Sequence, residues 1–390
     1  MMKKSTIGAL LLGGFSTIAH AQSSVTLYGN VDTGIAYTSN VQGKSLWQET
    51  QGIGLGNRWG LLGQGDLGNG LKAIFRLENG YSSSSGALLN GGRLFGRQAY
   101  VGLSQQQFGA VTFGRQYDSV VDYVSLLASS KQYADQMGAH IGDNDNMFNS
   151  LRINNSVKYA SSQIAGLSFG GLYAFSNQAS GGNSTGFSND SAFSVGAAYT
   201  NGPLKIAAAF LQLNHPSSGN ANGSNTGGAI SGDYNTLSTN IFYSQPVAKQ
   251  TVGAAGANYK ISGFTIGAVF SDVVFDYNDG TSLRLLNYEA NVSYQITQAI
   301  ATQLVYTFTD GTADGGASYG NFADGRHPRW QQVTAGASYS LSKATSLYVL
   351  AAYQLACGDA QRAAISPSGG ETAWGHRSQI ELTTGITVKF

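Results

Sequence analysis

The chain has 390 residues, and 11% of them are charged, against about 25% in a typical soluble domain. The single cysteine, Cys357, excludes an intramolecular disulfide, and a formal net charge of +1 argues against a nucleic-acid partner. The low charge, the 53 glycines, the 21 tyrosines and the lack of a helical pattern together indicate an all-β chain.

The first residues have the features of a secretory signal peptide. Lys3 and Lys4 precede an apolar stretch over residues 7–18, and Ala19-His20-Ala21 matches the small-residue cleavage signal. The alternative is a transmembrane anchor, for which the stretch is too short. We therefore expect residues 1–21 to be cleaved on export, which would change the formal charge to about −1.

Period-two alternation runs along the rest of the chain. In residues 24–37 apolar side chains occupy most odd positions, and polar ones such as Asn30 and Asp32 occupy even positions. Residues 71–78 and 288–296 alternate in the same way. Runs of about ten such residues cross a bilayer as tilted strands. The sequence therefore predicts transmembrane strands with one side facing lipid.

Short and long connections alternate, as is typical of outer-membrane barrels. Seven tight turns are expected at 67–70, 105–109, 164–166, 201–202, 262–263, 297–299 and 342–344. Eight long loops are expected near 39–51, 82–93, 117–150, 177–190, 215–249, 276–284, 312–330 and 358–376. These connections join sixteen strands, so we expect residues 22–390 to form one 16-stranded antiparallel β-barrel. The segment 236–244 alternates like a further strand, but an odd strand number would result, and we assign it to the loop 215–249.

The last strand alternates up to the final residue. From Ile380 to Phe390 the even positions are nearly all apolar, and the odd positions are polar or charged. A frayed apolar terminus gains little in water, so this face is expected to meet lipid.

These strands contain motifs that resemble the trimeric general-diffusion porins of Gram-negative outer membranes. The similar stretches are SSVTLYGNVDTGI (23–35), NRWGLLGQGDLGNGLKAIFRLENGY (57–81), LFGRQAYVGLSQQQFGAVTFGRQYD (94–118), GDNDN through LRINNSVKY (142–159) and the terminal GITVKF. The resemblance covers the whole mature chain. One departure lies in the second strand, where the family usually carries an acid after a glycine and this chain reads Gln64-Gly65-Asp66.

The resemblance implies a water-filled channel for passive diffusion of ions and small hydrophilic solutes, located in the outer membrane. It also implies a homotrimer that contacts outer-membrane lipid and lipopolysaccharide. The C-terminal strand with Phe390 resembles the signal that the barrel assembly machinery reads. No cofactor, metal or nucleic-acid partner is implied.

A pore selects solutes by its radius and by the charges at its narrowest point. The resemblance implies that the third loop, 117–150, folds into the lumen and opposes a basic cluster on the wall. The matching arginines are Arg58, Arg115 and Arg152, with Arg76 and Arg97 on neighbouring strands. The favoured loop acids are Asp118, Asp122 and Asp135. Five arginines against three aspartates indicate a mild preference for anions, and the alternative is that these charges only solvate the wall or pair with one another.

The alternation supports an inward direction for some of these arginines. Arg76 shares its face with Lys72 and Glu78 and is expected to face the lumen. Arg115 has the parity of an apolar face, so a bulge at Gly114 would have to turn it inward.

Asp143 and Asp145 have two interpretations. They could anchor the return of the third loop to the wall. They could also bind calcium, although the spacing lacks the distal glutamate of a calcium loop.

Other functions stay open at this point. A substrate-specific channel for a sugar or an anion is the main alternative. An outer-membrane enzyme would need a catalytic constellation around His140, His215, His327 or His376, and no catalytic motif surrounds them. An autotransporter or an envelope-anchoring barrel would need a further large region beside the barrel.

Overall fold

A computed structural model gives the fold. It describes residues 23–41, 43–177, 180–181, 184–185, 189–217, 227–230, 232–234, 242, 245–315, 325–365 and 376–390. The expected signal peptide, 1–21, lies outside these residues. Among the described residues, no helix is long and apolar enough to cross a membrane.

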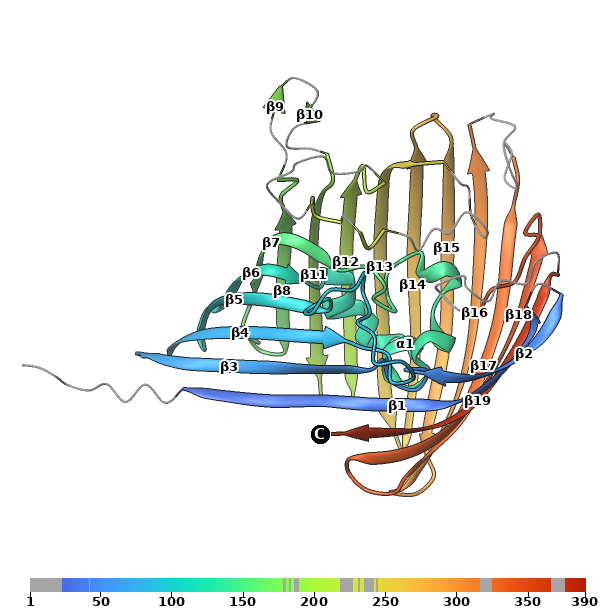
Figure 1. The fold of residues 1–390 in the computed structure, drawn as a ribbon, viewed down its shortest axis with the longest axis horizontal. Helices are drawn as coiled ribbons and strands as arrows, with labels where there is room; N and C mark the ends of the chain where they lie inside the picture. Colours follow the sequence, from blue (N-terminus) through green and yellow to red (C-terminus); the bar gives the residue numbers. More distant parts are fainter. Residues whose placement is uncertain are drawn as a thin grey trace, which may run out of the picture.

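The chain forms a closed antiparallel β-barrel (Figure 1). Its strands are β1 (Ser24–Val41), β2 (Lys44–Gln51), β3 (Arg58–Gly68), β4 (Leu71–Gly80), β5 (Gln98–Gln105), β6 (Gly109–Gln116), β7 (Ile153–Ala160), β8 (Leu167–Ala174), β11 (Ser191–Asn201), β12 (Leu204–Asn214), β13 (Val247–Ile261), β14 (Phe264–Tyr277), β15 (Ser282–Gln295), β16 (Ile300–Asp314), β17 (Pro328–Ser340), β18 (Thr345–Gly358) and β19 (Ser378–Lys389). A separate hairpin, β9 (Ser180–Gly181) and β10 (Ser184–Thr185), lies between β8 and β11.

Two of these strands share one place in the barrel. β2 pairs with the upper part of β1, from Thr33 to Val41, and β3 pairs with its lower part, from Ser24 to Asn30. The 17 strands of the main sheet therefore occupy 16 positions, and the predicted strand number and fold class are confirmed.

The connections agree with the sequence pattern except at two loops. All seven tight turns lie between the expected strands. The expected loop over 39–51 is wrong, because β1 runs on to Val41 and β2 returns from Lys44, with Tyr37 and Trp47 in contact at 5.1 Å across the hairpin. The expected long loop over 276–284 is also wrong. Only residues 278–281 connect β14 to β15, in a tight turn in which Gly280 has a φ of 84°.

The segment 236–244 lies largely outside the described residues. β12 pairs directly with β13 over eleven residue pairs, so no strand is inserted between them, as expected. Phe242 is the described residue of that segment, and it is buried against Phe275 and Trp330 inside the barrel.

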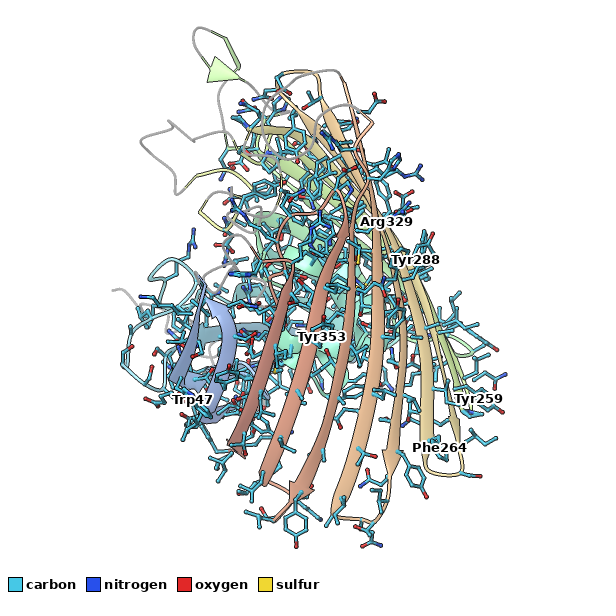
Figure 2. The ribbon with its side chains drawn as sticks, turned by 90° about the vertical axis from the view of Figure 1, so that its right-hand side faces the viewer. Trp47, Tyr259, Phe264, Tyr288, Arg329 and Tyr353 are labelled. Atoms are coloured by element: carbon cyan, nitrogen blue, oxygen red, sulfur yellow. The ribbon has the colours of Figure 1, made fainter. Side chains whose placement is uncertain are left out.

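The outer wall carries the apolar side chains of the alternating pattern. Ile380 and Leu382 of β19 are 46% and 45% exposed, and Glu381 between them is 1% exposed because it points inward. Figure 2 shows the aromatic side chains Tyr259 and Phe264 close to the short turns, and Tyr288 and Tyr353 higher on the same wall. Tyr259 and Phe264 near the short turns suit the aromatic girdle at one membrane interface.

Charged pairs lie on the outer wall at the strand ends away from the short turns. Arg329 Nε lies 2.6 Å from Asp310 Oδ1, and Arg284 Nη2 lies 2.6 Å from Asp272 Oδ2. All four side chains are partly or fully exposed, so this level suits the wet headgroup zone and not hydrocarbon.

The barrel closes between its first and last strands. Gly34 faces Gly385 in the β1–β19 register, and a Cβ added to Gly34 would lie 2.3 Å from the carbonyl oxygen of Thr384. Asp32 is fully buried at this seam. Its carboxylate accepts hydrogen bonds from Thr387 Oγ1, from Tyr348 Oη at 3.0 Å and from the amide of Gly54 at 3.3 Å. The seam therefore joins β1, β18, β19 and the segment between β2 and β3.

We expect Leu304→Arg to destabilise the barrel by about 2–4 kcal/mol, because Leu304 lies at the middle of the outward apolar positions of β16 and is 51% exposed. The free energy of unfolding, measured by urea titration with heat-modifiable gel mobility as the readout, checks this. Ser293→Arg on the neighbouring strand β15 is the control, because Ser293 lines the lumen. Equal losses in both variants would contradict the lipid-facing assignment.

Candidate functional site

The third loop lies inside the barrel and is built from short helical turns. They are η1 (Val120–Val124), η2 (Ser125–Leu127), α1 (Ser129–Gln132), η3 (Asp135–Gly138) and η4 (Ile141–Asp143). Figure 1 places α1 within the lumen. The loop is thus folded inward, as the resemblance implied.

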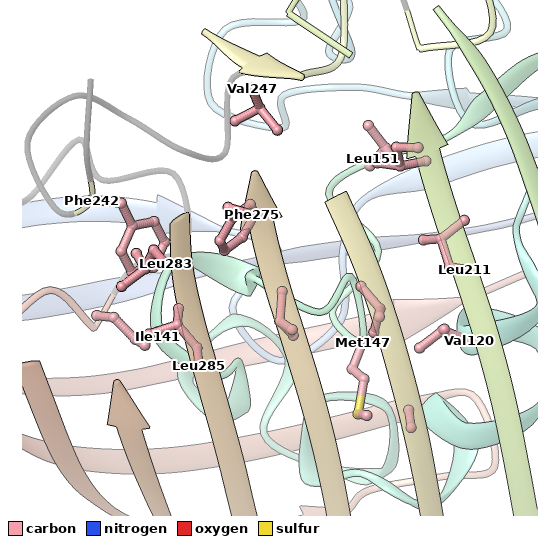
Figure 3. Packing of buried hydrophobic residues seen from close by; sticks show 14 of the residues in the cluster. Val120, Ile141, Met147, Leu151, Leu211, Phe242, Val247, Phe275, Leu283 and Leu285 are labelled. Atoms are coloured by element: carbon pink, nitrogen blue, oxygen red, sulfur yellow. The ribbon is translucent and has the colours of Figure 1, made fainter. Parts of the chain in front are cut away.

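Apolar packing holds one side of the third loop to the wall (Figure 3). Val120, Ile141 and Met147 of the loop belong to one buried cluster with inward side chains of the strands from β12 to β15, such as Leu211 and Leu285. Hydrophobic burial of this kind contributes roughly 1.5–3 kcal/mol per large side chain. The loop is therefore a packed part of the wall.

The return of the loop uses residues that tolerate the left-handed backbone region. Gly142, Asp143, Asn146 and Asn149 have φ values of 62°, 47°, 61° and 70°. Glycine, asparagine and aspartate reach this region at low cost, which explains the GDNDN composition as turn chemistry.

Asp143 and Asp145 both accept hydrogen bonds within the protein. Asp143 binds the amides of Phe148 and Ser150 at 2.8 and 2.9 Å. Asp145 accepts from Ser271 Oγ of β14 at 2.6 Å. In the part of the chain that the structure describes, no group of three His, Cys, Asp or Glu side chains could hold a metal ion.

A buried histidine links the loop to the wall at β15, on the side where the loop packs. His140 Nδ1 lies 2.6 Å from Asp145 Oδ2, and its Nε2 lies 3.4 Å from Glu289 Oε2 on β15. Glu289 also accepts from the amide and hydroxyl of Ser129, at 2.8 and 2.9 Å. We call His140, Asp145 and Glu289 the loop clamp. Burial alone would lower the pKa of His140, but the two carboxylates raise it to about 10.

The basic side chains gather on the other side of the lumen. A Cβ added to Gly56 would lie 3.5 Å from Nη2 of Arg58 and 3.8 Å from Nη1 of Arg97, so these two guanidinium groups share one space. Burial lowers the pKa of Arg152 to about 10, and the positive charge of Arg97 contributes to the decrease. Arg152 therefore lies near enough to Arg97 for the two charges to interact.

Arg115 joins this group through hydrogen bonds. Its Nε donates to Gly96 O at 2.8 Å, and its Nη1 donates to Arg152 O at 3.4 Å. The predicted bulge is present, because the β6–β7 register shifts between Gly114 and Gln116 and Gly114 has a φ of 133°. We call Arg58, Arg97, Arg115 and Arg152 the basic wall.

Arg76 meets the basic wall only indirectly in the described contacts, through Tyr28, whose hydroxyl donates to Glu78, the partner of Arg97. The guanidinium group of Arg76 stacks over the ring of Tyr28, 5.6 Å from the ring centroid. Asp122 forms an ion pair with Lys158 of β7, and the positive charge of Arg76 also stabilises its carboxylate. Arg76, Asp122 and Lys158 thus form a second charged group.

The three loop acids occupy different environments. Asp118 is fully buried and accepts from the amide of Val120 at 2.7 Å and from Asn146 Nδ2 at 2.7 Å. Burial and the charge of Asp122 raise the pKa of Asp118 to about 6. Asp135 comes closest to the basic wall. Its Oδ2 accepts from the amide of Gly56 at 3.1 Å, and the charges of Lys131 and Arg58 act on it.

Sequence reasoning missed several charged neighbours of the basic wall. Glu78 lies 2.7 Å from Arg97 Nε and accepts from Tyr117 Oη at 3.0 Å. Glu78 lies two positions after Arg76 on the same strand, and this shared face could have identified it as a residue of the lumen. Lys131 donates to Phe148 O at 2.6 Å, and burial lowers its pKa to about 7. Arg93 and Asp233 come from other loops and had no periodic signal.

The last residue lies against the first strand. The amide of Phe390 donates to Gly29 O, and the amide of Gly29 donates to Phe390 O, both at 3.0 Å. Phe390 is 57% exposed as a residue, and its ring lies over Gly29, where an added Cβ would approach it to 2.6 Å. The ring is therefore presented on the outer surface, near the short turns.

Comparison with known proteins gives consistent matches. A sequence model of the family described as Gram-negative porin matches residues 8–356. An outer membrane porin protein of Bordetella pertussis is 39% identical over 234 residues, which cover 55% of this chain and 60% of that relative. A major outer membrane protein P.IB of Neisseria meningitidis is 29% identical over 381 residues and covers 95% and 98%. The solved anion-selective porin from Comamonas acidovorans superposes with a TM-score of 0.71 at 23% identity, over 95% of this chain and 100% of that one.

We expect His140→Gln to weaken the loop clamp at neutral pH. Because the pKa of His140 rises on folding, its contribution is fully present below about pH 6.5 and is lost as the pH rises through about 10. The unfolding temperature of the wild type should therefore exceed that of the variant at pH 7, and the gap should narrow towards pH 10. His327→Gln, at an exposed histidine, should leave the wild-type profile unchanged. A gap that is constant between pH 6 and 10 would contradict a charged clamp.

Proposed function

The chain belongs to the family of Gram-negative porins, and on that premise we propose that its basic wall forms the pore constriction and gives the channel a preference for anions. The protein is an outer-membrane porin that forms a water-filled channel for ions and small hydrophilic solutes. The observation that carries the proposal is the approach of the Arg58 and Arg97 guanidinium groups beside Gly56, together with the hydrogen bond from Arg115 to Arg152 O on the same basic wall.

The local charge balance favours anions. Around the basic wall, the described side chains include five arginines, namely Arg58, Arg93, Arg97, Arg115 and Arg152, and also Lys131, which is only partly protonated at neutral pH because its pKa is about 7. Three carboxylates, Glu78, Asp135 and Asp233, partly offset them. An excess of positive charge at a narrow, poorly solvated point raises the local concentration of anions. The anion-selective porin from Comamonas acidovorans has the same fold.

Of the loop acids, we propose that Asp135 faces the pore at the constriction. Asp118 serves as an internal anchor, since backbone amides and Asn146 occupy its oxygens. Asp122 pairs with Lys158 and belongs with Arg76 to the second charged group.

The matched relatives are named as porins and outer membrane proteins. We propose no catalytic role for His140, because its imidazole ring is enclosed between Asp145 and Glu289 in the loop clamp.

We expect Arg58→Glu to shift the reversal potential towards cations in a planar bilayer under a KCl gradient. The change of two charge units at the constriction should lower the ratio of chloride to potassium permeability roughly fivefold or more. Arg284→Gln, on the outer wall, is the control and should leave the ratio unchanged. An unchanged ratio in a folded Arg58→Glu protein would place Arg58 outside the constriction. Saturation of conductance by one sugar or anion at micromolar concentration would instead favour a substrate-specific channel.

We also propose a homotrimer with outer-membrane lipid and lipopolysaccharide around it, assembled through the C-terminal strand. An outer membrane protein of Vibrio cholerae with the same fold, at 14% identity and a TM-score of 0.65, was solved in a trimer form. The exposed Phe390 ring at the end of β19 suits recognition by the barrel assembly machinery.

The unboiled, detergent-solubilised protein is expected to run as a trimer on a gel and to fall to the monomer on boiling. Bilayer conductance should close in three equal steps. A monomer in native mass spectrometry would contradict the trimer.

A further inference from the structure

A second loop enters the lumen beside the third one. It lies between β12 and β13, and we call residues 227–230 and 232–234, which are among its described residues, the inner segment. The amide of Asn154 donates to Ala229 O at 2.7 Å, and the amide of Ile230 donates to Asp190 Oδ1 at 2.9 Å. Ala229 and Ile230 are fully buried. The inner segment is thus fixed to the start of β7 and to the loop before β11.

The inner segment delivers one carboxylate to the basic wall. Asp233 Oδ1 lies 2.8 Å from Nη1 of Arg93, and Asp233 Oδ2 pairs with Nη2 of Arg115. The backbone amide of Arg152 also donates to Oδ2, at 3.3 Å. The side chain of Asp233 is 4% exposed. Three donors from three separate parts of the chain therefore converge on this carboxylate.

This position lets Asp233 act on permeating ions. Arg115 is itself held by Gly96 O and Asn154 Oδ1, so its charge is fixed next to Arg152. Electrostatic interactions are screened less in a poorly solvated site than in bulk water, so one carboxylate offsets a large share of the local positive potential. Among the described residues, Glu78 is a further acid bonded to the basic wall, and it pairs with Arg97.

We propose that Asp233 is a selectivity-determining residue of this pore, which limits its anion preference from a loop other than the third. The inference rests on the proposed anion preference of the basic wall. The alternative is that Asp233 only ties the inner segment to the wall, as many buried ion pairs do. The two roles differ in how the ratio of chloride to potassium permeability changes when Asp233 or Arg93 is neutralised. A role in selectivity predicts opposite changes for the two variants, whereas a purely structural role does not.

Asp233→Asn and Arg93→Gln break the same ion pair but change the charge in opposite directions. If Asp233 sets selectivity, Asp233→Asn should raise the ratio of chloride to potassium permeability by roughly threefold or more, and Arg93→Gln should lower it. The double variant restores the net charge and should return close to the wild-type ratio. Asp272→Asn, which removes the partner of Arg284 on the outer wall, is the matched control and should change nothing.

The measurement is the reversal potential under a tenfold KCl gradient, on protein that keeps its heat-modifiable gel mobility. Shifts in the same direction for both single variants, or no shift in Asp233→Asn, would overturn the proposal. If Asp233→Asn fails to fold, a double variant whose ratio differs from the wild type would overturn it as well. If the reversal potential of Asp233→Asn equals that of the wild type while Arg58→Glu shows its expected shift, the role of Asp233 is refuted and the proposed function is left intact.

Discussion

The hydrocarbon core of a bilayer offers no water to a backbone amide or carbonyl, and the rest of this structure depends on that constraint. Each strand has to find hydrogen-bonding neighbours on both sides, which only a closed sheet provides. Closure fixes two faces, and the alternation of the sequence assigns apolar side chains to lipid and polar ones to the lumen. Sixteen positions leave a wide lumen, so the selectivity of the channel depends on what fills it.

The third loop inside the barrel explains why part of the inner wall is apolar. Leu211, Phe275, Leu283 and Leu285 point inward yet are buried, because the third loop and Phe242 pack on them. The wall from β12 to β15 is therefore apolar on both faces at this level. The opposite side carries the arginines of the basic wall. Two of them form ion pairs with carboxylates from different parts of the chain, Arg97 with Glu78 and Arg115 with Asp233. One side of the lumen is thus a support for the loop, and the other is a charged surface.

The sequence predicted what depends on period and on turn chemistry. The number of barrel positions, the seven short turns and the lipid side of β19 all follow from local pattern. The extension of β1 into a hairpin with β2 was missed, because its polar strand residues project beyond the lipid and carry no apolar alternation. The directions of Asp118, Asp122 and Asp135 were not predictable, since the helical turns of the third loop rotate successive side chains to different sides.

Contacts between loops were the hardest to foresee. The approach of Asp233 to Arg93 joins residues 140 positions apart, and neither lies in a periodic segment. Such pairs depend on how two irregular segments pack, for which residue type alone gives no register. The arginines were identified because the family resemblance carries their positions, and their role in selectivity stays a prediction.

The seam at Asp32 has a kinetic consequence. Tyr348 and Thr387, which donate to its carboxylate, lie 316 and 355 residues further along the chain, so this network forms only when the last strand has docked. Contacts of such large sequence separation form late in folding, after the strands between them have paired. Interactions that form after the rate-limiting step slow unfolding without speeding folding. The buried aspartate at the seam therefore contributes to the lifetime of the assembled barrel more than to the rate at which it is made.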